Sequence, residues 1–510
     1  MSVLLSEALH AAARDTPDRT LVVDGDVRLD CATLHRRACD VAHALLARMP
    51  VGSVVAFMLP NWHEAAEFYL GATLAGMVVN PILPSLRDHE LRFILDDASV
   101  RLIVIPAAFR GHDYAAMLSR VVAELDSPPE VVVVRGDPGP HLGFGSLGAS
   151  HRQRALPRLD PAAVRMLMYT SGTTGRPKGV LHSHDSIGAL IAQLGEHWHV
   201  AAGDAFCVPS PIAHIGGSIY AFECPLLLGT TAVLMDRWEP AAAVELMTRH
   251  RCTHMAGATP FLDGLLAATT AAGTRLPDLK VFICGGASVS PSLIRRATAA
   301  FERAIVTRVY GSTEVPVTTV GVTDRRGDPH AADTDGRPGV AEIRIVDGEI
   351  RARGPQMLRR YAQDEDNLAA FDEHGFFRTG DLGRWVDGDY LVVTGRAKDI
   401  IIRNGENISP KEVEDLLVGE LGIAEVAVVG VPDARTGERA CAVVVPAPGA
   451  PGPDVAAMRA HLAERGVATF KVPERVEVWD SLPKNDAGKV LKHRIRDVLV
   501  KGTRASEATG

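Results

Sequence analysis

The 510-residue sequence predicts an α/β fold: a large N-terminal domain with two doubly wound sheets and a small β-barrel-like subdomain, and a smaller α+β C-terminal domain. Three observations support this prediction. Short apolar runs alternate with amphipathic helical patterns as far as residue 311, which is typical of parallel sheets covered by helices. Two Asp-Gly turns then follow, each between strands in which apolar and polar residues alternate. The last region mixes helices and strands, and we place the boundary at residues 394–398, between domains 1–393 and 399–510.

The first sheet is expected from apolar runs within the first 160 residues. Short apolar runs that are separated by helical patterns are typical of buried parallel strands. The same alternation returns beyond residue 160 and predicts the second sheet. Strands are expected at 53–60, 77–82, 100–106 and 130–134, helices at 63–74 and 88–97, and further strands at AFCVP, TAVLM, VFICGG and IVTRVYG.

The β-barrel-like subdomain is expected from two hairpins. Asp347-Gly348 and Asp387-Gly388 each stand between strands of alternating hydrophobicity, and Asp-Gly is a preferred two-residue hairpin turn. The C-terminal domain is expected from a renewed alternation of helices and strands: a helix from Pro410, the strand VAVVGV, a helix from Asp454 and the strand VPERVEVW.

Composition narrows the class of protein. Hydrophobic residues make up 46% and charged residues 23%, which is ordinary for a globular protein and excludes a disordered or fibrous one. The 54 Lys and Arg residues against 62 Asp and Glu residues give a formal net charge of −8. A diffuse acidic excess argues against nucleic acid or an anionic membrane as the main partner. The net charge does not exclude a local basic pocket that binds a small anion.

The cysteines and the apolar stretches indicate the compartment. The seven cysteines are scattered and form no CxxC pair, which favours reduced thiols over disulfides or a zinc site. The N-terminus lacks the pattern of a signal peptide, and no stretch approaches the ~18 apolar residues of a membrane span. These patterns predict a cytoplasmic protein.

The segment Tyr169–Val180, YTSGTTGRPKGV, concentrates groups that bind phosphate. Three glycines, four Ser or Thr hydroxyls and a lysine lie directly after the apolar run Met166–Met168. Backbone N–H groups in such loops form anion-binding nests, and α/β sheets place their ligand loops at strand ends. The Walker register GxxxxGKS/T is absent, which disfavours a P-loop kinase or GTPase. By composition alone, the tip of a surface hairpin is the alternative.

The complete string is more specific than its composition, because it resembles the phosphate loop of the adenylate-forming superfamily, which contains acyl-CoA synthetases, luciferases and peptide-synthetase adenylation domains. Seven further blocks resemble those of the superfamily and occur in its order, which excludes a chance match. The blocks are PIAHIGG from Pro211, GGA from Gly285, YGSTE from Tyr310, FRTGD from Phe377, GRAKD from Gly395, NGENISP from Asn404 and PKNDAGK from Pro483.

The resemblance implies an acyl-CoA synthetase that uses ATP, Mg²⁺ and CoA. A carboxylic acid attacks the α-phosphate of ATP to give an acyl-adenylate and pyrophosphate, and the thiol of CoA then takes the acyl group. Mg²⁺ and fixed cations offset the repulsion between the oxyanions. By resemblance, Thr170 and Glu314 hold Mg²⁺. The residues expected around the β- and γ-phosphates are Thr170, Ser171, Gly172, Thr173, Thr174, Gly175 and Lys178.

The same resemblance assigns the nucleoside contacts. Tyr310 offers a ring face to adenine. Asp381 accepts hydrogen bonds from the ribose hydroxyls, and Arg396 is a further ribose or phosphate contact. The other expected ATP-binding residues are Gly286, Ala287, Gly311, Ser312 and Thr313, with Thr313 near the α-phosphate.

Lys489 is the expected catalytic lysine, which by resemblance bridges the carboxylate and the α-phosphate during adenylation. In the superfamily the C-terminal domain rotates between an adenylating and a thiolating arrangement, so the resemblance makes this domain mobile, with the hinge at Lys398. After the rotation the residues expected at the CoA tunnel are His214, Arg403, Asn404 and Gly405.

His214 is expected to form a gate or wall of the acyl pocket, and a packed histidine near a turn is the alternative. Residues 215–218, which follow it, contain no carboxylate to pair with an amino group, so a hydrophobic acid of the fatty, alicyclic or aryl kind is the expected substrate. Two histidine patterns are not interpreted as metal sites: His182-Ser-His184 lacks carboxylates at ligand spacing, and His63-Glu64-Ala-Ala-Glu67 departs from HExxH. The expected pocket residues are His214, Ile215, Gly216, Gly217, Gly285 and Gly286.

Two other functions stay open at this point. The first is an adenylating enzyme that passes its acyl group to a carrier protein or another acceptor. The second is a non-catalytic nucleotide-binding relative, against which the complete set of Thr170, Glu314, Asp381 and Lys489 argues. The block that ends in Arg359-Arg360 before a tyrosine departs from the superfamily, which usually has a glycine there. A homodimer is one option for the assembly.

Overall fold

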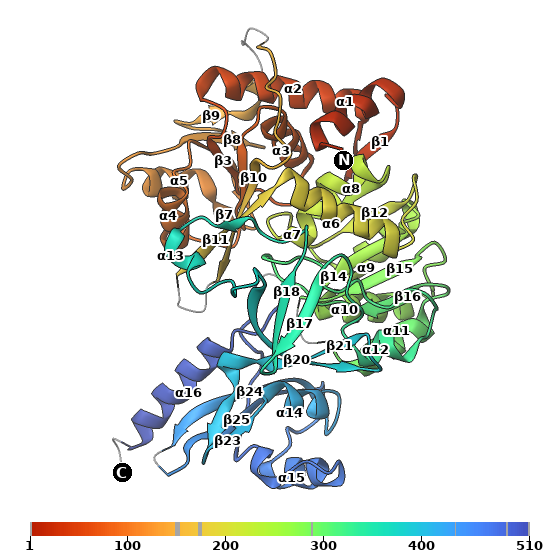
Figure 1. Ribbon diagram of the computed structural model, residues 1–510, viewed down its shortest axis with the longest axis vertical. Coiled ribbons are helices and arrows are strands. Elements are labelled where there is room, and N and C mark those ends of the chain that lie inside the picture. The colour runs from red at the N-terminus through yellow and green to blue at the C-terminus, as the bar shows by residue number, and fades with distance from the viewer. Residues whose placement is uncertain are drawn as a thin grey trace.

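The computed structural model describes residues 3–147, 154–171, 176–286, 289–433, 435–485 and 488–507. Figure 1 shows a large N-terminal body and a smaller C-terminal domain below it. The body contains two large sheets and a four-stranded antiparallel sheet, and the C-terminal domain has a sheet of its own. The predicted α/β class and two-part architecture are therefore confirmed. In the described ranges no helix is both long enough and apolar enough to span a membrane.

The seven-stranded sheet is parallel except at one edge, where β1 and β2 pair antiparallel. Helices α9 (Pro240–Arg249), α10 (Thr259–Ala271) and α11 (Pro291–Ala300) cover its outer face. In spatial order the strands are β16 (Ile305–Arg308), β15 (Val281–Cys284), β14 (His254–Gly257), β12 (Ala205–Val208), β13 (Thr231–Leu234), β1 (Thr20–Asp24) and β2 (Val27–Asp30).

The eight-stranded sheet has a parallel centre, and β10, β11 and β19 pair antiparallel at one edge. Helices α4 (Asp88–Asp97) and α5 (Tyr114–Val122) cover its outer face. In spatial order the strands are β19 (Arg360–Tyr361), β11 (Pro177–Ser183), β10 (Val164–Ser171), β4 (Val78–Pro81), β3 (Val54–Phe57), β5 (Leu102–Pro106), β8 (Glu130–Val134) and β9 (Leu142–Gly143).

The inner faces of both large sheets share one hydrophobic core. Successive residues of a strand point to opposite faces, so Val22 of β1 lies in this shared core while Val23 lies in the outer one. Strands that are buried on both sides consist of continuous apolar runs, which explains why the sequence revealed them. The helices in the shared core are α1 (Leu5–Asp15), α2 (Cys31–Arg48), α3 (His63–Leu74) and α6 (His184–His197).

The four-stranded sheet stands where the β-barrel-like subdomain was predicted. Its first hairpin has the expected two-residue turn, with positive φ at Asp347 and Gly348. The second turn differs from the prediction, because three residues, 387–389, separate its strands. The His330 ring holds the Asp387 carboxylate at 2.9 Å and stacks on Tyr390, and these tertiary contacts fix the longer loop. The strands are β17 (Glu342–Val346), β18 (Glu349–Arg353), β20 (Phe377–Val386) and β21 (Tyr390–Arg396).

The C-terminal sheet is covered on both faces. Val428 of β24 packs under α14 and α15, and its neighbour Val429 packs under α16. The strands are β22 (Ile401–Arg403), β23 (Glu406–Ile408), β24 (Ile423–Asp433), β25 (Gly437–Pro446) and β26 (Arg475–Val478). The helices are α14 (Pro410–Leu417), α15 (Val455–Glu464) and α16 (Lys492–Glu507).

Short elements complete the chain. The segment after β12 forms a continuous series of short helices that leads into the shared core. These and the other short elements are α7 (Ile215–Ser218), the π-helix η2 (Ile219–Glu223), α8 (Cys224–Leu227), α12 (Pro329–Asp333), α13 (Asp364–Asn367), η1 (Phe144–Ser146), η3 (Ala397–Asp399), η4 (Thr469–Lys471), β6 (Ala108–Phe109) and β7 (His112–Asp113).

A buried ion pair joins this helical segment to the eight-stranded sheet. Arg165 of β10 lies 2.7 Å from Glu223 of η2, and the two side chains are 3% and 0% exposed. The Tyr69 hydroxyl donates to the same Glu223 oxygen at 2.5 Å. The strand that leads to the phosphate loop is therefore fixed to the segment that follows His214.

We expect Glu223→Leu to lower the free energy of unfolding by about 3–5 kcal/mol, because it leaves the Arg165 guanidinium buried without its counter-charge. Urea unfolding measures the change. The double variant Arg165→Met/Glu223→Leu should recover much of the loss. Arg251→Ala removes an exposed ion pair with Asp278 and should change stability little. A single and a double variant of equal stability would contradict this account.

Candidate active site

Thr170 and Glu314 come from distant parts of the chain and meet at the carboxyl end of β10. Thr170 Oγ1 donates to Glu314 Oε1 at 3.5 Å, and the Tyr361 hydroxyl donates to the same oxygen at 3.0 Å. Burial, together with the Glu314 carboxylate, raises the pKa of the Tyr361 hydroxyl. Tyr361 therefore stays protonated and orients the Glu314 carboxylate.

These two side chains fit Mg²⁺. The ion prefers oxygen ligands at about 2.0–2.1 Å and usually keeps water and phosphate oxygens among them, so neighbouring ligand oxygens lie about 3 Å apart. The Thr170 and Glu314 oxygens are 3.5 Å apart, which is close to that separation. A carboxylate and a hydroxyl leave the remaining positions to phosphate and water.

The phosphate loop is described at its two ends. Lys178 lies on β11, directly opposite Thr170 in the ladder with β10. Its ammonium is 3.1 Å from the Asp366 carboxylate and 5.2 Å from the centre of the Tyr361 ring. The predicted phosphate contacts of the remaining loop lie outside the described residues: Gly172, Thr173, Thr174, Gly175 and the side chain of Ser171.

The loop 310–314 has a tightly fixed backbone. A Cβ at Gly311 would lie 2.6 Å from the backbone nitrogen of Val317, so this position requires glycine. His182 is buried and donates through Nε2 to the carbonyl of Thr313 at 2.7 Å. Burial lowers the pKa of His182 to about 4, so the ring is neutral at pH 7. His182 therefore positions the carbonyl of Thr313.

Asp381 is a buried carboxylate with two fixed partners. The Tyr310 hydroxyl donates to its Oδ2 at 2.7 Å, and Arg396 Nε lies 2.7 Å from its Oδ1. β20 and β21 place Asp381 directly opposite Arg396 in their ladder. Each carboxylate oxygen keeps a further lone pair that can accept a hydrogen bond from a ribose hydroxyl.

Lys489 lies against the N-terminal body. A Cβ on the preceding Gly488 would be 2.9 Å from the Pro260 side chain in the first turn of α10. Burial, together with repulsion from Arg396, lowers the pKa of Lys489 to about 8, while the Asp381 carboxylate acts in the opposite direction. The predicted catalytic lysine therefore lies beside the predicted ribose-binding residues.

We call residues 208–218, the segment around the predicted pocket residue His214, the acyl loop. His214 precedes α7, and its buried Nε2 finds no hydrogen-bond partner among the described residues. Burial lowers its pKa to about 4, so the ring is neutral. A Cβ at Gly217 would lie 2.1 Å from the carbonyl oxygen of Pro211, whereas a Cβ at Gly216 would meet no atom of the described residues within 4 Å. Among the described residues, the loop is therefore tightly packed at Gly217 and open at Gly216.

Three other predicted contacts lie at strand ends. Gly285 follows β15 and packs against Val309, where a Cβ would approach to 2.7 Å. Gly286 has φ +81°, and a Cβ there would meet no atom of the described part of the chain within 4 Å. Ser312 Oγ accepts from the backbone nitrogen of Val315 at 3.2 Å. Ala287 lies outside the described residues.

Lys398, predicted for the hinge, and three of the four residues predicted for the CoA tunnel lie between β21 and β23, whereas the fourth, His214, lies in the N-terminal body. Lys398 lies in η3, between β21 and β22. Arg403 pairs with Glu474 at 2.8 Å, and Asn404 and Gly405 form the turn between β22 and β23. The hinge, the tunnel and the domain boundaries stay predictions.

Three side chains that the sequence analysis did not assign complete the site: Tyr361, His182 and Asp366. The first two contact Glu314 and Thr313, which are 47 and 131 residues away in the chain. At such separations no spacing pattern marks a pair. The sequence departs from the superfamily directly before Tyr361, and it has two histidines at 182 and 184. Neither feature indicates which residue the side chain contacts.

Family comparisons match most of the chain. The AMP-binding enzyme family matches residues 9–362, and the AMP-binding enzyme C-terminal domain matches residues 412–489. The chain belongs to the AMP-binding enzyme family. It is an adenylate-forming enzyme of the acyl-CoA synthetase type, an acid–thiol ligase that uses ATP and CoA, which confirms the resemblance seen in the sequence.

Similar curated proteins include two CoA ligases and a carrier-loading enzyme. The medium-chain fatty-acid–CoA ligase of Escherichia coli is 32% identical and aligns over 98% of this chain and 90% of its own. A methyl-dioxo-octahydro-indenyl propanoyl:CoA ligase of Rhodococcus jostii is 35% identical over 96% and 98%. The salicyl-AMP ligase / salicyl-S-ArCP synthetase of Mycobacterium tuberculosis is 34% identical over 96% and 90%.

A solved structure supports the same fold. The ATP-bound MatB of Rhodopseudomonas palustris superposes with a TM-score of 0.86 at 28% identity, over 98% of this chain and 99% of that one. The amide bond synthetase McbA of Marinactinospora thermotolerans superposes with a TM-score of 0.84 at 26% identity, over 96% and 99%.

The lowered pKa of Lys489, about 8, predicts the pH dependence of adenylation. The amine of the free enzyme loses its proton as the pH rises through this value, so kcat/KM for acid-dependent pyrophosphate exchange should fall above about pH 8. Lys489→Arg keeps its charge at higher pH. This variant should therefore lose the decrease above pH 8, while its maximal rate is reduced. If the arginine variant shows the same decrease above pH 8, the decrease belongs to another titratable group.

Proposed function

We propose that this ligase activates a hydrophobic carboxylic acid as an acyl-adenylate and transfers it to CoA, releasing AMP and pyrophosphate. The acyl loop supports the proposal most directly. Ile212 of this loop and Ile219 directly after it are buried, and a Cβ at Gly216 would meet no described atom within 4 Å. Glu223, the one carboxylate of the series of helices after His214, is paired with Arg165. A substrate amino group would find no free counter-charge in this segment.

The roles proposed for the site residues follow from the charges that must meet. The acid and ATP are both anionic, so their approach requires fixed positive charge in a site of low dielectric. Lys489 supplies an ammonium beside Asp381 and Arg396, which orient the ribose. Mg²⁺, held by Thr170 and Glu314, would screen the phosphate charge when bound. The neutral His214 ring forms a wall of the proposed acyl pocket without adding a charge to it.

A panel of acids tests the proposed function. Pyrophosphate release is measured with acetate, octanoate, benzoate and cyclohexanecarboxylate, each with and without CoA. We expect release to require one of the larger acids and to become multiple-turnover with CoA. Turnover with acetate alone would overturn the hydrophobic class, and no release with a broadened panel would favour a non-catalytic relative.

A carrier protein is the second candidate acceptor, because the similar salicyl-S-ArCP synthetase is named for loading one. Mass spectrometry of the products with CoA and with a phosphopantetheinyl carrier protein separates the two. Acyl-CoA formation at a higher kcat/KM supports the proposal, and exclusive acylation of the carrier contradicts it.

We expect Lys489→Ala to lower the rate of adenylation about a thousandfold and to spare thioester formation from preformed acyl-adenylate. A charge pair at ~4 Å with an effective dielectric of ~20 contributes roughly 4 kcal/mol, which corresponds to that rate when it acts only in the transition state. Lys492→Ala is the matched control, because Lys492 pairs with Glu414 within the C-terminal domain. Equal loss in both half-reactions would contradict the assignment.

We expect Lys398→Pro to preserve adenylation and to block transfer to CoA, since proline fixes the φ of a residue that the proposed domain rotation must change. Lys398→Ala removes the same side chain and leaves the backbone free, so it should support both steps. The two half-reactions are measured by pyrophosphate exchange and by thioester formation. Unimpaired overall turnover of the proline variant would exclude a hinge at this residue.

A further inference from the structure

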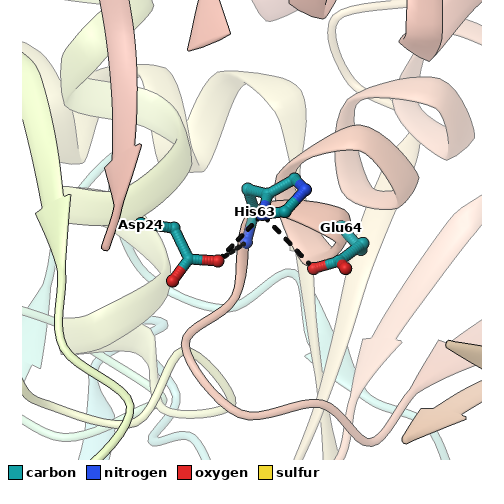
Figure 2. Close-up of side chains that lie close together, drawn as sticks. All are labelled: Asp24, His63 and Glu64. Atoms are coloured by element: carbon teal, nitrogen blue, oxygen red, sulfur yellow. Dashed lines mark hydrogen bonds and ion pairs between the residues drawn. The ribbon is translucent and has the colours of Figure 1, made fainter. Parts of the chain in front are cut away.

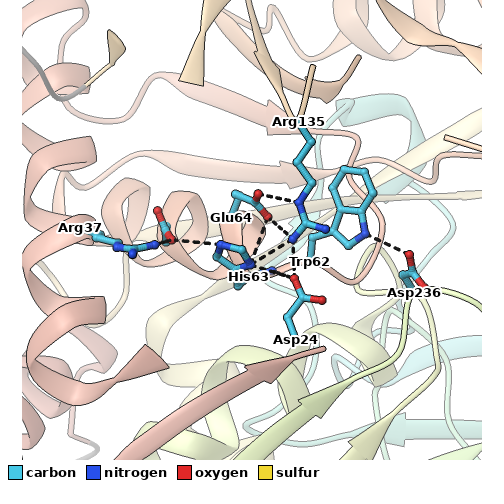
Figure 3. A network of polar contacts seen from close by, with 8 residues as sticks. Asp24, Arg37, Trp62, His63, Glu64, Arg135 and Asp236 are labelled. Atoms are coloured by element: carbon cyan, nitrogen blue, oxygen red, sulfur yellow. Dashed lines mark hydrogen bonds and ion pairs between the residues drawn. The ribbon is translucent and has the colours of Figure 1, made fainter. Parts of the chain in front are cut away.

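A polar cluster outside the candidate active site lies where the two large sheets meet. Asp24 ends β1, and His63 and Glu64 begin α3, with one ligand atom of each within 4.8 Å of the others (Figure 2). An imidazole and two carboxylates are donors that transition metals accept. Figure 3 shows Arg135 between these carboxylates: its Nη2 lies 2.5 Å from Asp24, and its Nε lies 2.7 Å from Glu64. The guanidinium therefore takes the cation position.

This network fixes the segment 61–64 to both sheets. Asp24 belongs to the seven-stranded sheet, and Arg135 directly follows β8 of the eight-stranded sheet. The Arg135 guanidinium stacks on the Trp62 ring at 4.1 Å, and Trp62 Nε1 donates to Asp236 at 3.1 Å. Asp236 follows β13 of the seven-stranded sheet. The backbone at Trp62 and His63 is therefore anchored from opposite sides.

Asn61 extends from this anchored segment to the acyl loop. Its Nδ2 donates to the carbonyls of Val208 and Ser210, both at 2.9 Å, and its Oδ1 accepts from the backbone nitrogen of Ile212 at 3.0 Å. Asn61 is 4% exposed. One side chain thus satisfies three backbone groups that are costly to leave unpaired in the interior.

A displacement of residues 208–212 moves His214. The backbone nitrogen of His214 donates to the carbonyl of Pro211 at 2.9 Å, and Gly217 packs against the same carbonyl. The loop between β12 and α7 is therefore a single tight unit, and Asn61 holds its first half.

We propose that Asn61 is a positioning residue for acid binding: it holds the acyl loop and His214 in place, and the network around Arg135 holds Asn61. The inference rests on the proposed role of the acyl loop as the wall of the acid site. Asn61 acts through residues 208–214 and does not contact the acid. Acid affinity should therefore depend on Asn61, while nucleotide affinity should not.

The test uses octanoyl sulfamoyl adenosine, a non-hydrolysable mimic of octanoyl-adenylate, with AMP as the reference ligand, both measured by calorimetry on the full chain. Asn61→Ala should weaken binding of the mimic about 10- to 100-fold, from unpaired buried groups, and leave AMP binding within about twofold. In kinetics, the KM for octanoate should rise while the KM for ATP stays unchanged. Asn61→Asp is nearly isosteric and keeps the oxygen that accepts from Ile212. It should likewise weaken binding of the mimic and leave AMP binding within about twofold.

Asn80→Ala is the matched control, because Asn80 is also buried and donates to a backbone carbonyl, that of Leu167 at 2.8 Å in the eight-stranded sheet. It should lose stability without changing the ratio of mimic to AMP affinity. Equal weakening of mimic and AMP by Asn61→Ala, or no weakening of either, would overturn the inference. A wild-type chain that binds AMP but neither the octanoyl mimic nor the corresponding benzoyl and cyclohexanecarbonyl mimics would overturn the hydrophobic-acid proposal, and this inference with it.

Discussion

The buried ammonium of Lys489 is the constraint on which the arrangement of the candidate active site depends. Its pKa falls from 10.5 to about 8 because the group is buried and lies near Arg396. Such a difference corresponds to roughly 3 kcal/mol against the charged form. Anionic substrates would offset this penalty, since opposite charges attract strongly where water is excluded. On the proposed mechanism, the same penalty favours withdrawal of the C-terminal domain once the anions have left.

The N-terminal body provides fixed surroundings for this charge. Gly217 and Gly311 fit closely against neighbouring backbone, His182 holds the carbonyl of Thr313, and Asn61 holds the acyl loop. Neutral groups perform the positioning: burial keeps His182 and His214 uncharged. The charges that the proposed reaction uses directly include those of Glu314, Asp381, Arg396 and Lys489.

Much of the fold was predictable because strands that are buried on two faces have continuous apolar sequences. Helix α3 was predicted at 63–74 and α4 at 88–97, and both are found at these residues. The turn at Asp347-Gly348 was predictable from local chemistry, while the longer turn at Asp387 depends on His330, 57 residues away. A contact between residues this far apart in the chain cannot be predicted from the local sequence.

The sequence by itself determined the α/β class, the two-part architecture and the family, because these depend on local periodicity and on contiguous blocks. Only the tertiary structure decided which side chains contact one another. Tyr361 reaches Glu314, Arg135 takes the place of a metal beside Asp24, and Asn61 joins the acyl loop from 151 residues away. Such contacts form where two sheets meet, and the chain brings them together only when both sheets have folded.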